Sequence, residues 1–128
     1  MDERNRWCFA CGRDNPIGLQ LSFREEKDTY ITTFTPGPQH QGYDGIVHGG
    51  IVSTLLDEIM ARYVYSKGIN AVTARLEIRY RRPTPVGQEL TITGKIDRQR
   101  GKMFEMTGCI QLADGTVTAE GKATVMKV

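Results

Sequence analysis

The chain has few cysteines and histidines, little net charge and no long hydrophobic run. Among its 128 residues are three cysteines and two histidines, and the formal net charge is +2. An odd number of cysteines excludes a fully paired disulfide framework. The small net charge gives no support to a nucleic-acid-binding protein, and no stretch approaches the roughly 20 apolar residues of a membrane span. We therefore expect reduced thiols, no nucleic-acid or membrane partner, and a cytoplasmic location.

The composition is that of an ordinary globular protein. Apolar residues make up 39% of the chain and charged residues 25%, which excludes a disordered or fibrous protein. The length suits one domain with one core, and no internal repeat is visible. We expect residues 1–128 to form a single domain.

Cys8 and Cys11 have the spacing of half a zinc site or of a redox pair. A closed zinc site needs four ligands, and no second cysteine pair or histidine cluster follows. We interpret these residues as structural thiols, with metal binding and redox pairing as alternatives, and we expect no metal and no cofactor.

The first half of the chain predicts two strands and one long helix. Residues 19–23 alternate between apolar and polar side chains, and residues 30–35 form a second candidate strand, with a hairpin turn expected at 25–28. From Ile51 the period changes to that of a helix, and Gly68 is a natural helix end. The helical stripe comprises Ile51, Val52, Leu55, Leu56, Ile59, Met60, Tyr63 and Val64.

The second half of the chain alternates with period two and predicts four more strands. These strands begin near Ala74, Leu90, Phe104 and Val117, and Asp114-Gly115 suits a hairpin turn. The pattern predicts an α+β domain whose antiparallel six-stranded sheet wraps around the helix. Because one helix covers only part of such a sheet, we also expect a second copy of the chain as partner.

A glycine-rich loop before the helix is the first candidate site. Gly49 and Gly50 leave backbone N–H groups at the helix entry without a side chain to block a ligand. Such groups can stabilise negative charge on a carbonyl oxygen, with about 3 kcal/mol per donor in comparable sites. The alternative interpretation is a tight turn that needs small residues.

Two adjacent carboxylates lie in the middle of the predicted helix, on opposite flanks of the apolar stripe. Glu58 has Arg62 one turn ahead, the spacing of a solvated ion pair on a helix surface. Asp57 has no such cation and is the better candidate for a base or nucleophile. The alternative for Asp57 is a capped or water-bonded side chain.

His48 and His40 lie in or beside the glycine loop. Either residue could be a general base, a donor to a ligand or a loop residue. Their spacing does not match a catalytic metal motif.

Basic residues gather at two predicted strand ends. Guanidinium groups match phosphate oxygens, so these residues are candidates for binding a phosphorylated ligand, although a solvated rim is the alternative. The two groups are Arg79, Arg81 and Arg82, and Arg98, Arg100 and Lys102.

Three features of the chain together resemble the hotdog-fold thioesterases, in particular their phenylacetyl-CoA and acyl-CoA thioesterase-like branch. These features are Val47-His48-Gly49-Gly50, Asp57 nine residues after the histidine, and the later strand 73–83. The opening Cys8-Phe9-Ala10-Cys11-Gly12 and the segment 15–19 also look like a recurrent start in this branch. The resemblance implies a hotdog fold and hydrolysis of an acyl-CoA.

The resemblance also implies roles for individual residues. The Gly49 amide would polarise the thioester carbonyl, Asp57 would activate water or attack directly, and Thr73 would orient the water or the carboxylate. His48 would have a positioning role. The chain would form a homodimer with shared sites, paired again into a tetramer.

One position departs from the resemblance. Some relatives have an asparagine six residues before the histidine, and this chain has Gly42 there, with Gln41 beside it. Gln41 is therefore the candidate for the missing amide contact to the substrate.

Two other functions remain as alternatives. An enoyl-CoA hydratase or dehydratase of the same fold would work through a histidine and an acidic residue, and His40 with Glu58 could form that pair. A non-catalytic acyl-CoA-binding protein would use the same pocket without turnover.

Overall fold

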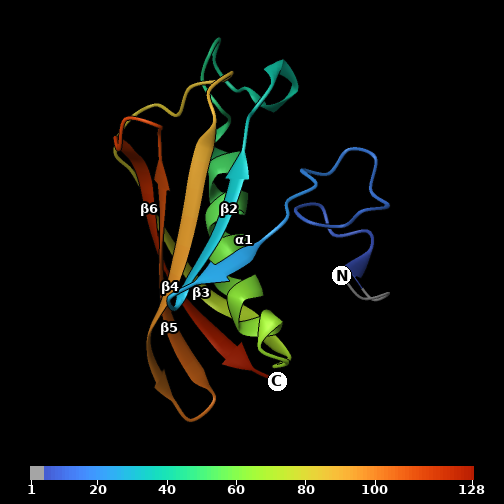
Figure 1. Ribbon diagram of the computed structural model, residues 1–128, viewed down its shortest axis with the longest axis vertical. Coiled ribbons are helices and arrows are strands. Elements are labelled where there is room, and N and C mark those ends of the chain that lie inside the picture. The colour runs from blue at the N-terminus through green and yellow to red at the C-terminus, as the bar shows by residue number, and fades with distance from the viewer. Residues whose placement is uncertain (1–4) are drawn as a thin grey trace.

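The computed structural model describes residues 5–128 as one long helix against an antiparallel sheet (Figure 1). Helix α1 is followed by the four longest strands, and the strand order across the sheet is β1-β2-β4-β5-β6-β3. The predicted α+β architecture, a six-stranded antiparallel sheet wrapped around one helix, is confirmed. The elements are β1 (Arg24–Glu26), β2 (Thr29–Phe34), the 3-10 helix η2 (Pro38–His40), α1 (Gly49–Ser66), β3 (Ala71–Tyr80), β4 (Leu90–Arg100), β5 (Met103–Gln111) and β6 (Val117–Lys127).

Helix α1 packs its apolar stripe against the sheet. All but one of the residues predicted for this stripe are buried, the exception being Ile51, which is half-buried. The helix ends near Gly68, whose φ of 81° suits glycine. Within the described residues, no helix is both long enough and apolar enough to cross a membrane.

A row of three glycines lets α1 approach the sheet closely. Gly94, Gly108 and Gly121 are paired in register across β4, β5 and β6. A Cβ atom on Gly94 would lie 2.8 Å from the carbonyl oxygen of Ile59, and one on Gly121 would lie 3.0 Å from the end of the Met60 side chain. The row is therefore where the helix backbone sits deepest on the sheet.

The prediction of a strand at residues 19–23 was wrong. Leu19 and Leu21 are buried, as the alternation suggested, but their N–H groups donate to the carbonyls of Phe9 and Ala10. Gln20 has a φ of 57°, which interrupts an extended backbone. The first strand of the sheet is instead β1, and the hairpin turn is limited to residues 27–28, which both have positive φ.

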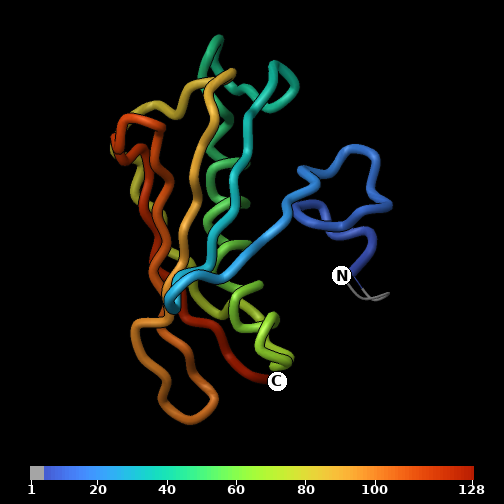
Figure 2. Tube along the Cα trace, viewed as in Figure 1, coloured from blue at the N-terminus to red at the C-terminus, as the bar shows by residue number. Residues whose placement is uncertain are grey.

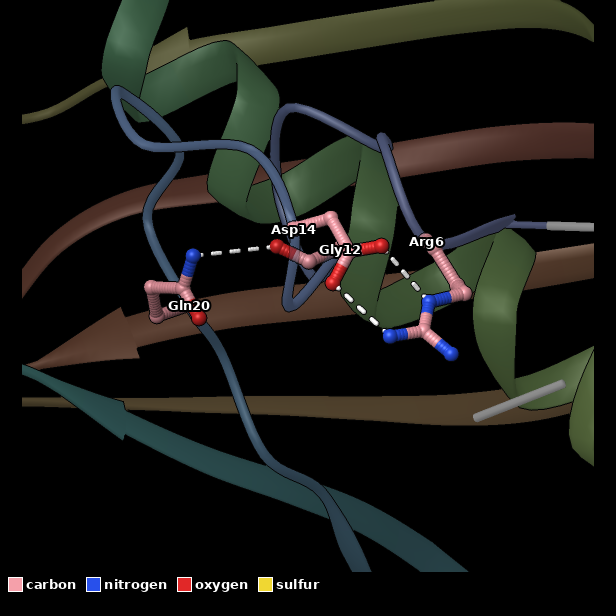
Figure 3. Close-up of polar contacts among 4 residues, drawn as sticks. All are labelled: Arg6, Gly12, Asp14 and Gln20. Atoms are coloured by element: carbon pink, nitrogen blue, oxygen red, sulfur yellow. Dashed lines mark hydrogen bonds and ion pairs between the residues drawn. The ribbon is translucent and has the colours of Figure 1, made fainter. Parts of the chain in front are cut away.

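Residues 5–23 form a looped segment beside α1, on the side away from the main sheet (Figures 1 and 2). Its polar contacts are largely internal. Figure 3 shows Arg6 donating to both carboxylate oxygens of Asp14, at 2.7 and 3.0 Å, and the Gln20 side chain donating to the Gly12 carbonyl at 3.0 Å. We call residues 5–23 the N-terminal segment.

Strand β3 lies at the edge of the sheet and is exposed along most of its length. It pairs only with β6 among the described strands. Three of its apolar side chains, Val72, Leu76 and Tyr80, are 54%, 38% and 54% exposed. A long edge strand with exposed apolar side chains is suited to pairing with another chain.

The glycine row predicts a graded loss of stability. Gly94→Ala is expected to lower the free energy of unfolding by roughly 1–3 kcal/mol, since its methyl group would overlap the backbone of α1. Gly121→Ala is expected to cost less, because the flexible Met60 side chain can move aside. Urea unfolding at one protein concentration measures both changes, and a Gly94→Ala protein as stable as wild type would contradict the close packing.

Candidate active site

The loop before α1 and the end of β3 border an open cavity of about 660 Å³. Backbone hydrogen bonds hold this loop, including Val47 N–H to the Thr84 carbonyl at 2.8 Å and His48 N–H to the His40 carbonyl at 2.9 Å. The cavity therefore has a fixed wall. It is lined by Gly42, Tyr43, Ile46, Val47, His48, Gly49, Val52, Tyr80, Arg81, Arg82, Pro83 and Thr84.

His48 is the N-cap of α1. Its Nδ1 accepts a hydrogen bond from the Gly50 N–H at 2.8 Å, so the neutral ring carries its proton on Nε2. This contact engages the Gly50 amide, which sequence analysis had proposed for ligand binding. The Gly49 N–H, at the first position of the helix, makes no hydrogen bond within residues 5–128 and is exposed. Gly49 is thus the amide that remains available to a carbonyl oxygen.

Tyr80 is part of this site and was missed from the sequence. Its hydroxyl donates to the Gly49 carbonyl at 3.0 Å and lies 2.7 Å from Ser53 Oγ. In the sequence Tyr80 is one apolar residue of an alternating strand, and no local signal marks it. Only the packing of β3 beside α1 brings its hydroxyl to the helix start.

Asp57 lies two turns further along α1 and contacts Thr73. The Thr73 hydroxyl donates to Asp57 Oδ1 at 2.8 Å, and both side chains are half-buried. A register shift between Thr73 and Arg75 marks a bulge in β3, a feature that re-aims neighbouring side chains. Thr73 therefore holds the Asp57 carboxylate within one chain.

Gly49 and Asp57 are too far apart to act on one carbonyl within a single chain. They are eight residues apart on α1, and at 1.5 Å per residue this separation is about 12 Å along the helix axis. A reacting carbonyl must lie about 3 Å from both its hydrogen-bond donor and its nucleophile. If Gly49 and Asp57 act on the same carbonyl, one chain therefore presents two half-sites.

Gln41 does not line the cavity, whereas Gly42 does. The side-chain oxygen of Gln41 accepts a hydrogen bond from the Gly45 N–H at 3.1 Å, and the side-chain NH₂ group takes no part in this hydrogen bond. Gln41 therefore braces the glycine loop, and its proposed contact to substrate stays a prediction.

The structure separates the predicted basic residues. Arg81 and Arg82 line the cavity, and Arg81 forms an ion pair with Glu120. Arg79 lies beside Arg81 in a neighbouring groove. The second group lies in the β4–β5 hairpin, at the opposite end of the sheet from the glycine loop (Figure 1). This group consists of Arg98, Arg100 and Lys102. Arg98 forms an ion pair with Glu105 at 3.2 Å.

The prediction that Glu58 and Arg62 form an ion pair on the helix surface was wrong. No ion pair joins these residues in the described part of the chain, and the Glu58 carboxylate instead lies 3.8 Å from Cys8 Sγ. Burial raises the pKa of Glu58, against the lowering effect of the hydrogen bond with Cys11 and of the Arg62 charge. The physical reason is that the N-terminal segment covers this flank of α1.

His40 and Glu58 have separate partners. The His40 ring packs edge-on against Phe34, with centroids 5.0 Å apart, and its Nδ1 accepts the Gly37 N–H at 3.0 Å. Glu58 contacts the N-terminal segment. The pair that a hydratase would need therefore has no counterpart in these contacts.

A profile of the thioesterase superfamily matches residues 44–119, more than half of the chain. This chain belongs to the thioesterase superfamily. The matched region contains the end of the glycine loop, α1, β3 to β5 and the first residues of β6.

Curated relatives carry acyl-CoA thioesterase names. The chain is 31% identical over 124 residues to acyl-coenzyme A thioesterase THEM4 of Mus musculus. This alignment covers 94% of this chain and 53% of that protein. It is 31% identical over 90 residues to acyl-coenzyme A thioesterase 13 of Homo sapiens, covering 67% of this chain and 64% of that protein. The chain thus spans about half the length of the mouse relative.

Solved structures confirm the predicted hotdog fold. A crystal structure of a thioesterase superfamily protein superimposes with a TM-score of 0.89 at 31% identity, covering 95% of this chain and 61% of that chain. A hypothetical thioesterase of Streptococcus pneumoniae, solved with coenzyme A, superimposes with a TM-score of 0.78 at 25% identity, covering 84% and 85%.

The cap at His48 predicts a difference between two substitutions. His48→Ala is expected to lower the free energy of unfolding by roughly 1 kcal/mol because the Gly50 N–H loses its acceptor. His48→Asn is expected to keep most of the stability, since asparagine is a strong N-cap. Chemical unfolding of both variants checks this, and equal losses would contradict the capping role.

Proposed function

We propose that this chain hydrolyses an acyl-CoA thioester to a free acid and CoA. The observation that carries the proposal is the unengaged Gly49 N–H at the start of α1, on the same helix as a carboxylate held by Thr73. Membership of the thioesterase superfamily supports it. The presence of coenzyme A in the S. pneumoniae structure supports CoA as the leaving thiol.

In the proposed reaction Gly49 and Asp57 act on opposite sides of the thioester. Asp57 accepts a proton from water as the water oxygen adds to the carbonyl carbon, and the Gly49 N–H stabilises the charge on the carbonyl oxygen. The carbon–sulfur bond then breaks, and the departing sulfur takes the proton from Asp57 and leaves as the thiol. Direct attack by Asp57, followed by hydrolysis of the acyl-enzyme, gives the same products. Thr73 is a positioning residue for the carboxylate.

We propose that the working enzyme is a homodimer with sites shared between two copies. The 12 Å estimated between Gly49 and Asp57 requires the second half-site to come from elsewhere. Strand β3 supports this arrangement because it carries Thr73 near one end and Tyr80, the partner of Gly49, at the other.

Antiparallel pairing of two β3 strands would join the two half-sites. If the two-fold axis passes between Leu76 and Glu77, Thr73 of one copy lies opposite Tyr80 of the other. Asp57 of one chain then stands beside Gly49 of its partner. The exposed apolar side chains of β3 would be covered by the same contact.

The remaining expectations follow from this proposal. Arg79, Arg81 and Arg82 lie at or near the cavity and are the proposed contacts for CoA phosphates. The residues of the β4–β5 hairpin would contact CoA phosphates only if the cavity of a partner subunit faced this hairpin. These residues are Arg98, Arg100 and Lys102. A pair of dimers and a cytoplasmic location stay predictions.

Removal of the Asp57 charge tests the catalytic proposal. Asp57→Asn is expected to lower kcat for thiol release from acyl-CoA by at least about 10²-fold, because the amide cannot accept the proton. Thiol release from a panel of aromatic and aliphatic acyl-CoAs, with circular dichroism as a folding control, measures the effect. Wild-type turnover in the variant would contradict the role of Asp57, and tight binding without turnover in wild type would indicate a non-catalytic binding protein.

A mixed dimer tests the shared site. Gly49→Pro deletes the proposed N–H donor at the first helical position, where proline is tolerated, and His48 already has the extended ψ of 134° that proline requires of the residue before it. A dimer of one Gly49→Pro chain and one Asp57→Asn chain is expected to regain about half of wild-type activity, since one of two composite sites is intact. Co-expression with two tags isolates this species.

The controls separate the amide from the added side chain. Gly49→Ala keeps the N–H, and its methyl group would lie 3.6 Å from Tyr80, an ordinary contact, so this variant is expected to retain far more activity than Gly49→Pro. A mixed dimer as inactive as either parent would overturn the shared site while leaving the role of Asp57 standing.

A further inference from the structure

A second cluster of reactive side chains lies on the opposite flank of α1 from Asp57. Cys8 Sγ, Cys11 Sγ and a carboxylate oxygen of Glu58 all lie within 4.8 Å of one another. The cysteines come from the N-terminal segment and Glu58 from the helix, so the cluster joins parts of the chain 50 residues apart. Nothing in the proposed hydrolysis uses these groups.

We propose that Cys8, Cys11 and Glu58 bind a zinc ion. Around a tetrahedral zinc, two thiolate sulfurs lie about 3.8 Å apart, and a sulfur and a carboxylate oxygen lie about 3.6 Å apart. The Cys8 Sγ to Glu58 Oε2 distance is 3.8 Å, and the other ligand pairs, which lie within 4.8 Å, would each need to close by at most roughly 1.2 Å. Two sulfur ligands favour zinc over magnesium or calcium, which prefer oxygen alone. The sequence showed only the two cysteines, because the third ligand comes from the helix.

The charges around the cluster suit a divalent ion. Two thiolates and one carboxylate around Zn²⁺ leave one net negative charge. Arg62 follows Glu58 by one turn of α1, and its Nε is buried without a hydrogen-bond partner in the described residues. One guanidinium therefore balances the site.

The N-terminal segment is the kind of structure that a metal ion stabilises. It contains no strand or α-helix before β1, yet Ala10, Cys11, Leu19 and Leu21 are buried. Long ordered segments without regular secondary structure are uncommon, and small loop-rich units often rely on a disulfide or a metal. A zinc ion at this cluster would fix the segment to α1, with the fourth ligand position open to water.

Zinc content of the purified full chain tests the proposal. Under reducing conditions and without chelators, elemental analysis is expected to find about one zinc per chain, and Co²⁺ substitution is expected to give a thiolate-to-cobalt charge-transfer absorption. Cys8→Ser and Glu58→Gln are each expected to weaken zinc binding at least about tenfold. Cys109→Ser, in a half-buried position on β5, is the matched control and is expected to bind zinc as wild type does.

Metal-free protein offers a second measurement that does not depend on activity. Added Zn²⁺ is expected to raise the melting temperature of wild type and of Cys109→Ser but not of Cys8→Ser. Wild-type protein without bound zinc and without the cobalt absorption would overturn the proposal. A Cys8–Cys11 disulfide in the reduced-buffer preparation, found by peptide mapping, would also overturn it.

Discussion

The contact between α1 and the row of glycines positions everything else in the molecule. Gly94, Gly108 and Gly121 carry no side chains, so the backbone at Ile59 can approach the middle of the sheet. Once the apolar stripe of α1 faces the sheet, the orientation of the whole helix is determined. Asp57 must then face the β3 side, and Glu58, about 100° further round, must face the N-terminal segment. Two neighbouring carboxylates thereby enter different chemical environments.

The surroundings of these two carboxylates suit the different roles proposed for them. Asp57 is half-buried with one hydroxyl donor, and its flank borders the uncovered β3 strand. Glu58 is also half-buried, but it lies beside two thiols and one helical turn from a guanidinium. A carboxylate beside an uncovered strand suits catalysis, whereas one that lies between two thiols suits metal binding.

Much of this fold could be predicted because its main signals are local. The stripe of α1 and the alternation of β3 to β6 reflect burial on one face, which is visible in any short window of sequence. The error at residues 19–23 has the same origin, since Leu19 and Leu21 do alternate in burial. Alternation reports which side chains are buried but not which backbone they pair with, and here the partner is a loop at Phe9 and Ala10 rather than a strand.

The parts of the site that could not be predicted depend on contacts between distant segments. Tyr80 joins the start of α1 only because β3 returns along the helix, and Glu58 loses its expected partner only because the N-terminal segment folds over it. The Gly50 amide was also a candidate for ligand binding, and the structure shows that the His48 ring accepts its hydrogen bond. Local sequence identifies a chemical group, and tertiary structure decides whether that group is free.

The edge strand β3 connects stability to function in the proposed dimer. A ten-residue edge with exposed Val72, Leu76 and Tyr80 would favour uncontrolled association if it stayed unpaired. Pairing with a second β3 removes this exposure, and it also brings Asp57 of one chain to Gly49 of the other. The same exposed strand would thus drive association and complete the catalytic site. An isolated chain would then be less stable, because the apolar side chains of β3 stay exposed. It would also be inactive, because the two half-sites lie two helical turns apart on one rigid helix.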